Sequence, residues 1–319
     1  MEIIKIRHPY DQSEIPKEKV VLVLGFFDGV HRGHQKVIQA GKKKADELGV
    51  KLAVMTFNHH PSVVFKKMGK EDLKYLTSLS QKERLMSWLG VDYLYEIEFT
   101  SDFAHLPPQD FVDQYIVGLH AQAAVSGFDY TYGPKDIADV AHLPGYAKGR
   151  FDVITVAKET EEGDKISSSR IRDLLEVGGM EEVNHLLGYP YSIDGVVVHG
   201  EARGRTLGYP TANIKFSHYA RLPMEGVYVC EMTIAGKRYP AMGSIGHNDT
   251  FGEGRQLTME IYVLDFNQDI YGEQVSVSWL HLIRGQVKFD GAQGLIDQLQ
   301  EDEAATRRYF IENPIEEIE

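Results

Sequence analysis

The order of strand-like and helix-like segments limits the folds open to this chain, because that order changes part-way along the sequence. In the first half, short apolar runs alternate with amphipathic segments of helical length. Such alternation predicts an open parallel sheet with helices on both faces. After about Leu187, strand-like runs follow one another with tight turns between them, which predicts a small antiparallel β-barrel. With 319 residues, we expect two domains, residues 1–184 and 185–319.

In the first half, five segments are predicted to be strands and four to be helices. The predicted strands are residues 20–27, 51–57, 91–99, 121–128 and 151–157. The predicted helices are residues 34–48, 80–89, 107–117 and 167–177. Ser80 and Glu83 have the spacing of a capping box at the start of the second helix. Ligands of parallel sheets bind where the carboxyl ends of the strands meet, so we expect the site residues to follow the strands.

The second half is predicted to consist of five strands and one closing helix. The predicted strands are residues 191–199, 226–234, 238–245, 256–265 and 273–283, and the helix is residues 294–310. Alternation of Val275, Val277 and Trp279 with two serines predicts a strand with one buried face. Residues 235–237 have the composition of a hairpin turn.

Charge and composition exclude several functional classes. Acidic residues outnumber basic ones, 47 to 34, and the net charge of −13 argues against a nucleic-acid partner. A single cysteine, Cys230, excludes an internal disulfide and a cysteine-based zinc site, and it fits a reducing cytoplasm. The N-terminus lacks the apolar core of a signal peptide, and no apolar run reaches the roughly 20 residues that cross a bilayer. We therefore expect a cytoplasmic protein without a membrane partner, and a weak homo-oligomer is left open.

The strongest local signal is GFFDGVHRGH, residues 25–34, where a predicted strand runs into a turn and then a helix. Gly25, Gly29 and Gly33 let the backbone approach a ligand closely. A helix N-terminus offers unpaired N–H groups, and His31 and His34 add donors for a phosphate. The alternative is an ordinary strand–turn–helix junction with two incidental histidines. A transition-metal cluster with His59 and His60 is a further alternative, although the spacing does not favour it.

A second signal is ISSSRIR, residues 166–172, at the start of the last helix of the first half. Any of its serines could act only as a helix cap. Arg170 and Arg172 are less expected there, because cations oppose the helix dipole at that end. A bound polyphosphate would remove that conflict.

A third signal is HGEARGRTLGYPTANI, residues 199–214, which is rich in glycine and arginine. Thr211 and Asn213 place two oxygen ligands on one side of an extended segment, an arrangement suited to Mg²⁺. The alternative is a polar surface loop of the barrel.

HxGH together with ISSxxxR resembles the nucleotidyltransferase superfamily. In more detail, GFFDGVHRGHQ, TFNHHP and GFDYTYG resemble the adenylyltransferase half of the bacterial bifunctional riboflavin kinase/FAD synthetase family. GRTLGYPTANI, GVYV, MEIYVLDF and IYG resemble its riboflavin kinase half. The resemblance covers nearly the whole chain in order. It implies a Rossmann-like nucleotidyltransferase domain and a barrel domain that make FMN from riboflavin and FAD from FMN, each with ATP and Mg²⁺.

The resemblance also implies roles for individual residues. His31, His34 and Arg172 would be catalytic in adenylyl transfer, and Glu260 would activate the riboflavin hydroxyl. Thr211 and Asn213 would hold Mg²⁺. The implied ATP-binding residues are Gly25, Phe26, Asp28, Gly29, Gly33, Ser167, Ser168 and Ser169 in the first half, and Arg203, Gly204, Arg205 and Thr206 in the second. The implied flavin-binding residues are Phe57, His60, Pro61, Asp129 and Tyr130.

Other functions remain open on the sequence. The family often has Asn where Phe26 and Asp129 stand, which leaves open a chain that keeps only one activity. HxGH also occurs in aminoacyl-tRNA synthetases, although the net charge of −13 does not favour a tRNA-binding enzyme. A flavin sensor that is not an enzyme is the alternative from another class.

Overall fold

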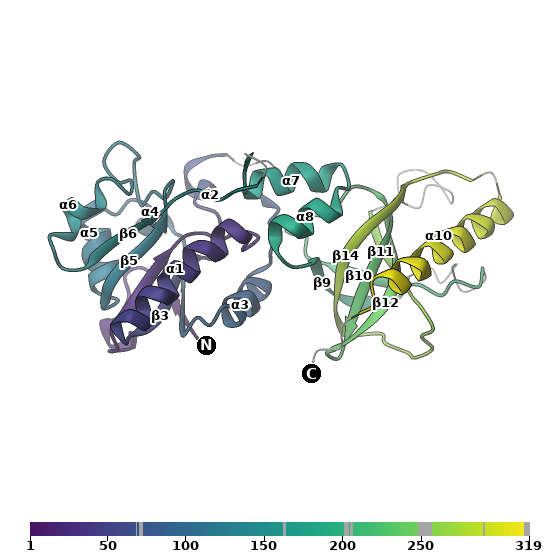
Figure 1. Ribbon diagram of the computed structural model, residues 1–319, viewed down its shortest axis with the longest axis horizontal. Coiled ribbons are helices and arrows are strands. Elements are labelled where there is room, and N and C mark those ends of the chain that lie inside the picture. Colours follow the sequence, from purple (N-terminus) through teal and green to yellow (C-terminus); the bar gives the residue numbers. More distant parts are fainter. Residues whose placement is uncertain are drawn as a thin grey trace. The chain divides into compact units, whose positions relative to one another are not determined.

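A computed structural model describes residues 1–67, 69, 73–161, 164–200, 204, 207–247, 257–289 and 291–315. The chain divides into two compact units, Met1–Ser168 and Ser169–Glu319, which are described separately below (Figure 1). The domain boundary expected at residues 184/185 stays a prediction. The division into compact units describes packing, and it does not assign the segment from Ser169 to residue 184 to either activity.

The first unit is built on a six-stranded parallel sheet in the order β1-β4-β3-β2-β5-β6. The chain leaves β2 toward β3 and β4 on one side, and it later returns to pair β5 and β6 on the other. The β2/β5 pair is therefore the switch point of the sheet, where ligands of such folds bind. The strands are β1 (Glu2–Ile6), β2 (Val20–Leu24), β3 (Lys51–Phe57), β4 (Tyr93–Ile97), β5 (Ala121–Gly127) and β6 (Asp152–Val156). A short antiparallel pair, β7 (Thr160–Glu161) and β8 (Asp164–Lys165), follows.

Side chains of β2 alternate between two cores, one on each face of the sheet. Val21 and Val23 pack in the core that contains Ile38 of α1 and Met86 of α3. Residues of the opposite face pack against the segment that begins at Phe111. The helical elements are η1 (Gln12–Glu14), α1 (Arg32–Leu48), α2 (Ser62–Phe65), α3 (Leu79–Trp88), α4 (Ser101–Ala104), α5 (Pro108–Phe111), the π-helix η3 (Val112–Val117) and α6 (Leu143–Ala147).

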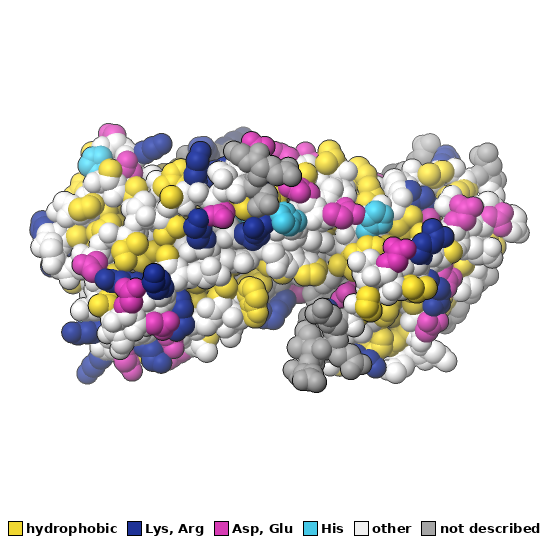
Figure 2. Space-filling model, in the orientation of Figure 1, with side chains coloured by type: hydrophobic (Ala, Val, Ile, Leu, Met, Phe, Trp, Pro, Cys, Tyr) yellow, Lys and Arg dark blue, Asp and Glu magenta, His cyan; other side chains and the backbone are white. Residues whose placement is uncertain are grey.

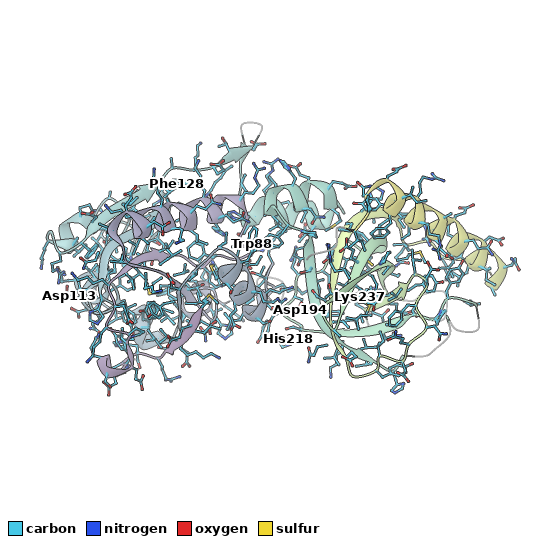
Figure 3. All side chains as sticks on the ribbon, turned by 60° about the horizontal axis from the view of Figure 1, so that its bottom comes forward. Trp88, Asp113, Phe128, Asp194, His218 and Lys237 are labelled. Atoms are coloured by element: carbon cyan, nitrogen blue, oxygen red, sulfur yellow. The ribbon has the colours of Figure 1, made fainter. Side chains whose placement is uncertain are left out.

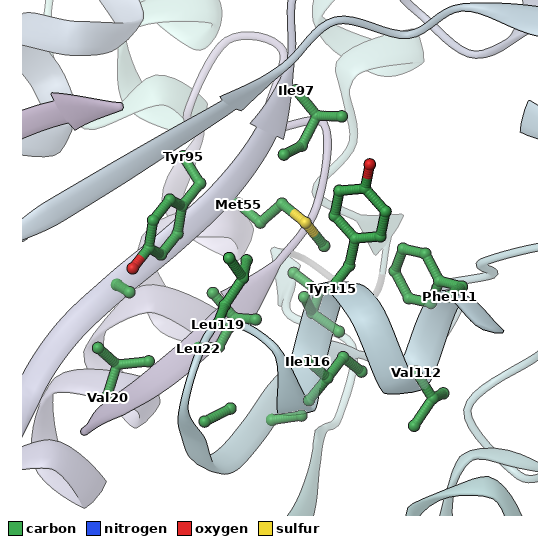
Figure 4. Close-up of a cluster of buried hydrophobic side chains, with 14 of the residues drawn as sticks. Val20, Leu22, Met55, Tyr95, Ile97, Phe111, Val112, Tyr115, Ile116 and Leu119 are labelled. Atoms are coloured by element: carbon green, nitrogen blue, oxygen red, sulfur yellow. The ribbon is translucent and has the colours of Figure 1, made fainter. Parts of the chain in front are cut away.

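The second of these cores is shown in Figure 4. Leu22 and Met55 of the sheet and Tyr115 and Ile116 of the π-helix belong to this one cluster (Figure 4). The Tyr115 ring meets Phe103 edge-on, with centroids 4.8 Å apart. Because both faces of the sheet are covered, its inner strands β2, β3 and β4 are buried almost throughout rather than on alternate residues.

The second unit contains a closed antiparallel barrel in the order β10-β13-β12-β11-β14-β9. Helix α8 packs against β9 and β14, and α10 packs against β11 and β12. Trp279 and Cys230 are fully buried, as expected for the inward side of alternating strands. The elements are α7 (Ser168–Glu176), α8 (Met180–Leu187), β9 (Tyr191–Val198), β10 (Ala212–Phe216), β11 (Gly226–Ile234), β12 (Lys237–Gly246), β13 (Thr258–Val263), β14 (Gln274–Gly285) and α10 (Ala292–Glu312).

Some local predictions are wrong. The capping box of α3 uses Ser78 and Gln81, not Ser80 and Glu83, because the helix begins at Leu79 and its N-cap is Ser78. Trp88, the last residue of α3, is 65% exposed (Figure 3). Strands β1 and β10 and helix α8 were not predicted.

Candidate active sites

The first site begins where β2 ends, in the turn that leads to α1. Phe27, Gly29 and Val30 all have positive φ, at 56°, 81° and 35°. Such a backbone is unfavourable for a β-branched residue, so the surrounding structure must hold Val30 in place. The turn ends at His31, which caps α1 by accepting a hydrogen bond on Nδ1 from the His34 N–H at 3.3 Å.

His31 and His34 stack face to face at this helix N-terminus, with ring centroids 3.6 Å apart. Because Nδ1 of His31 is an acceptor, neutral His31 carries its proton on Nε2 and can donate from that atom. His34 Nδ1 is buried and has no hydrogen-bond partner among the described residues. A buried polar atom without a partner in the protein is explained if a ligand or solvent supplies one. The two rings therefore form a donor pair at the N-terminus of α1.

The histidine pair is neutral at pH 7. Burial lowers the pKa of His31 to about 4, and the charge of Lys165 acts in the same direction. Burial also holds the pKa of His34 well below its usual value, assisted by His31, Lys82 and Lys165. Neutral imidazoles can donate to phosphate oxygens without placing two like charges 3.6 Å apart.

Two sets of hydrogen bonds hold the turn from outside. The buried Asp28 carboxylate accepts from the N–H groups of Leu76 and Thr77, at 2.9 and 3.3 Å. The Asp28 carbonyl accepts from Ser168 Oγ at 2.9 Å, which ties the first residue of α7 to the turn. Asp28 and Ser168 were both expected at the ATP site, and the structure brings them together.

Phe26 connects the turn to the residues expected near the flavin. Its ring meets His60 edge-on at 5.1 Å and Tyr75 at 5.7 Å. Pro61 follows His60 and precedes α2. Phe57, the last residue of β3, is buried and packs on Phe99 at 5.0 Å.

Residues after β5 complete this edge of the sheet. Asp129 accepts from Lys165 Nζ at 2.5 Å, and the same ammonium lies 4.9 Å from the ring of Phe128. Burial raises the pKa of Tyr130, so it stays neutral at physiological pH. The residues expected after β2, β3 and β5 thus gather at the carboxyl edge of three adjacent strands.

Lys165 and Lys82 were not identified from the sequence. Both charges act on His34. Lys165 could have been noticed because it immediately precedes the ISSSRIR segment. On the visible face of the molecule acidic and basic side chains are mixed, so binding of an anion depends on such local cations (Figure 2).

The helix expected to grip the phosphates, α7, carries Ser169, Arg170 and Arg172. Arg170 pairs with Glu182 of α8 at 2.7 Å, which supplies a counter-ion within the protein. The predicted polyphosphate is therefore not needed to explain Arg170. Arg172 and Ser167 take part in further interactions within the chain.

The second site lies on β10 and β13 of the barrel. Thr211 Oγ1 donates to Glu260 Oε2 at 3.1 Å, and Asn213 pairs with Glu260 in the strand register. The three residues expected to bind Mg²⁺ and activate the hydroxyl therefore lie together. Among the described residues, no group of three His, Cys, Asp or Glu side chains could hold a metal by itself.

Glycines allow the chain to cross closely beside these residues. A Cβ on Gly200 would lie 2.1 Å from Asn213 Nδ2, and one on Gly204 would lie 2.1 Å from the Tyr209 carbonyl oxygen. Only glycine fits either position without displacing its neighbour. Arg203, Arg205 and Thr206 lie outside the described residues.

Comparison with known proteins decides between the readings that the sequence leaves open. The FAD synthetase family model matches residues 13–170, and the riboflavin kinase family model matches residues 187–310. A bifunctional riboflavin kinase/FMN adenylyltransferase of Listeria monocytogenes is 46% identical over 97% of this chain and 98% of its own length. The chain belongs to this family. The predicted family, fold class and pair of enzymatic activities are thereby confirmed.

A second relative carries the same family name, and one solved structure shares the fold over nearly the whole chain. The bifunctional riboflavin kinase/FMN adenylyltransferase of Bacillus subtilis is 42% identical over 97% of this chain and 98% of its own length. A crystal structure named as a macrolide-efflux protein from Streptococcus pneumoniae is 40% identical, with a TM-score of 0.86 over 95% of this chain and 99% of that one. Within the described part of the chain, no helix is both long and apolar enough to cross a membrane.

Proposed function

We propose that the β2/β5 edge of the first unit joins AMP from ATP to FMN, and that the Thr211–Glu260 region of the barrel phosphorylates riboflavin. The observation that carries the first assignment is the stacked His31–His34 pair at the N-terminus of α1. The observation that carries the second is the hydrogen bond between Thr211 and Glu260 beside Asn213.

In adenylyl transfer, a phosphate oxygen of FMN attacks the α-phosphorus of ATP. The new P–O bond forms as the bond to the β-phosphate breaks, and pyrophosphate leaves. The attacking oxygen is already anionic, so the site needs alignment and charge stabilisation rather than a strong base. His31, His34 and Arg172 would donate to phosphate oxygens at the N-terminus of α1, and Ser168 would hold the turn through its hydrogen bond to the Asp28 carbonyl. The aromatic edge around Phe57, His60 and Tyr130 would hold the flavin.

In the kinase reaction, the attacking group is the riboflavin 5′-hydroxyl, which must lose a proton. Glu260 would accept that proton while the hydroxyl oxygen bonds to the γ-phosphorus and ADP leaves. Thr211 would keep the Glu260 carboxylate oriented through its hydrogen bond.

Mg²⁺ is part of the proposal for the barrel site. A threonine hydroxyl and an asparagine amide oxygen are hard oxygen ligands, and Mg²⁺ is commonly held by few protein ligands together with phosphates and water. Thr211 and Asn213 fit that donor set. Bound there, the ion would neutralise charge on the ATP phosphates.

The assay that tests both sites is chromatography of flavins after incubation with ATP and Mg²⁺, starting from riboflavin or from FMN. The wild-type chain should form FMN and then FAD, and the assay with dithionite-reduced flavin shows which redox state is used. Asn213→Ala should abolish FMN formation and leave FAD formation from supplied FMN intact. Loss of both products in a folded variant would contradict two separate sites.

The proposal keeps the expected partners: riboflavin, FMN and ATP, without nucleic acid or membrane, in a cytoplasmic protein. Size-exclusion chromatography with light scattering would test the homo-oligomer left open by the sequence. A gel-shift assay with RNA would test the sensor alternative.

A further inference from the structure

One cation, Lys82, is buried directly behind the turn between β2 and α1. It is only 3% exposed, although lysine is rarely buried without a counter-charge. It lies near the N-terminal end of α3, where a positive charge opposes the helix dipole. Its burial and its position in the helix both disfavour the charge, so a compensating interaction is expected.

Lys82 Nζ makes two hydrogen bonds with described residues, to the Phe26 carbonyl at 2.7 Å and to Thr56 Oγ1 at 3.1 Å. Thr56 Oγ1 in turn donates to the same carbonyl at 2.8 Å. The ammonium also lies 4.3 Å from the centroid of the Phe26 ring. Lys82 thus holds both the backbone and the ring of a residue in the middle of the proposed ATP-binding turn.

The same segment of chain holds the turn at a second point. Leu76 and Thr77 donate to Asp28, two residues after Phe26. The turn is therefore fixed from residues 76–82 before it delivers His31 and His34 to the N-terminus of α1.

The charge of Lys82 needs a reason beyond packing. A methionine would fill a similar volume without the cost of removing an ammonium from water, and both hydrogen-bond acceptors are uncharged. Asp28 and Glu96 favour the ammonium electrostatically, and its charge reaches His34. A polyphosphate bound at the histidines would be a strong anionic partner for it.

We propose that Lys82 is a positioning residue for adenylyl transfer, an inference that rests on the proposed function of the first unit. Its ammonium fixes the Phe26 carbonyl, and thereby the turn that carries the histidines, and its charge stabilises the ATP phosphates from the protein side.

The test compares three variants in FAD formation from FMN at varied ATP concentration. Lys82→Met removes the charge and should lower kcat/KM for ATP about tenfold or more. This is less than the roughly 100-fold loss of rate that follows removal of a preorganised donor in direct contact with the reacting group. Lys82→Arg keeps the charge and should retain most of the activity. Lys42→Met is the matched control, because Lys42 lies on the exposed side of α1 in an ion pair with Asp46, and it should behave as wild type.

The pH dependence separates the charge from a packing role. Burial lowers the pKa of Lys82 to about 8, whereas it raises the pKa of Glu96 only to about 7 and holds that of His34 well below its usual value. The wild-type kcat/KM for ATP should therefore fall above pH 8, and that of Lys82→Arg should not, since arginine stays charged. If the Met variant does not fold, this comparison still decides the question.

His31→Asn is measured in parallel to keep the two proposals apart. If Lys82→Met has wild-type constants while His31→Asn loses FAD formation, the role of Lys82 is overturned and the proposed site stands. If His31→Asn is also unaffected, the site itself is wrong. If kcat/KM for ATP falls above pH 8 in the same way for wild type and Lys82→Arg, the proposed role of the Lys82 charge is overturned.

Discussion

The imidazole rings of His31 and His34 lie face to face, with centroids 3.6 Å and planes 16° apart. Two protonated rings at this distance would repel strongly, so the arrangement suits two neutral donors. Gly33, between them in sequence, leaves the space that the His31 ring occupies.

His34→Asn should lower kcat for FAD formation from FMN about 100-fold, the typical cost of removing one preorganised donor. Flavin chromatography of timed samples measures the rate. FMN formation from riboflavin in the same preparation should stay at the wild-type rate. A variant that makes FAD normally would remove His34 from the reaction.

Acid should destabilise the first unit through His31. The pKa of His31 falls from 6.5 to about 4 on folding, so between these values the unfolded chain binds more protons. The free energy of unfolding is therefore unaffected by His31 above about pH 6.5 and decreases as the pH falls toward 4. At roughly 1.4 kcal/mol per pKa unit, the decrease amounts to about 3 kcal/mol.

Urea unfolding of wild type and His31→Asn between pH 7.5 and 4.5 tests this sign. Asparagine can still cap α1, so the variant removes the titration and keeps the cap. The wild type should lose more free energy of unfolding than the variant over this range. Equal losses would mean that His31 is not responsible.

Gly33→Ala should impair adenylyl transfer without unfolding the protein. A Cβ at this position would lie 3.2 Å from the Cε1 and Nδ1 atoms of His31, so the ring must shift. Alanine favours a helix by about 1 kcal/mol over glycine, which should offset the crowding in the free energy of unfolding. We expect FAD formation to fall about tenfold, in line with the sensitivity of catalysis to small misplacements.

Gly145→Ala provides the control for this substitution, because a Cβ there meets no atom within 4 Å. It should leave both activities unchanged. If Gly33→Ala also left FAD formation unchanged, the position of the His31 ring would not limit the reaction.

Glu260→Gln should lower the rate of FMN formation about 100- to 10,000-fold, the range expected for loss of a general base. Glutamine can still accept the Thr211 hydrogen bond, so the local structure should persist. The variant should form FAD from supplied FMN at the wild-type rate. A fall in both rates at unchanged thermal stability would contradict a role restricted to the barrel.

Much of the sheet could be predicted from sequence because its central strands are buried on both sides. The apolar run at residues 51–57 coincides with β3, and in the barrel the strand predicted at residues 226–234 coincides with β11. Strand β1 was missed because it is largely exposed and pairs only with β4, so it has no continuous apolar run. Strand β10 is short, only Ile214 of its five residues is buried, and its partner β13 is distant in sequence.

The capping box shows why local patterns alone are not sufficient. Ser78 with Gln81 and Ser80 with Glu83 both satisfy the same spacing. The structure selects the earlier pair because it buries Lys82 and Met86 on one side of α3. That choice depends on contacts with β2 and β3, which no local window contains.

Lys82 itself carried a signal that could have been used. Arg170 and Arg172 were singled out because cations near a helix start are unfavourable, and the same reasoning applies to Lys82. What the sequence could not supply is the acceptor, because Phe26 lies 56 residues away and becomes its neighbour only when α3 packs against β2.

The two units differ in whether they have edge strands with which another chain could pair during folding. The barrel closes on itself through β9 and β10, so every one of its described strands is paired on both sides. The parallel sheet instead ends at β1 and β6, whose outer backbone groups could accept a foreign strand. Glu2 and Lys5 place charges along β1, a feature that discourages such pairing. Aggregation during refolding should therefore start from the sheet, and removing the charge of Lys5 should accelerate it.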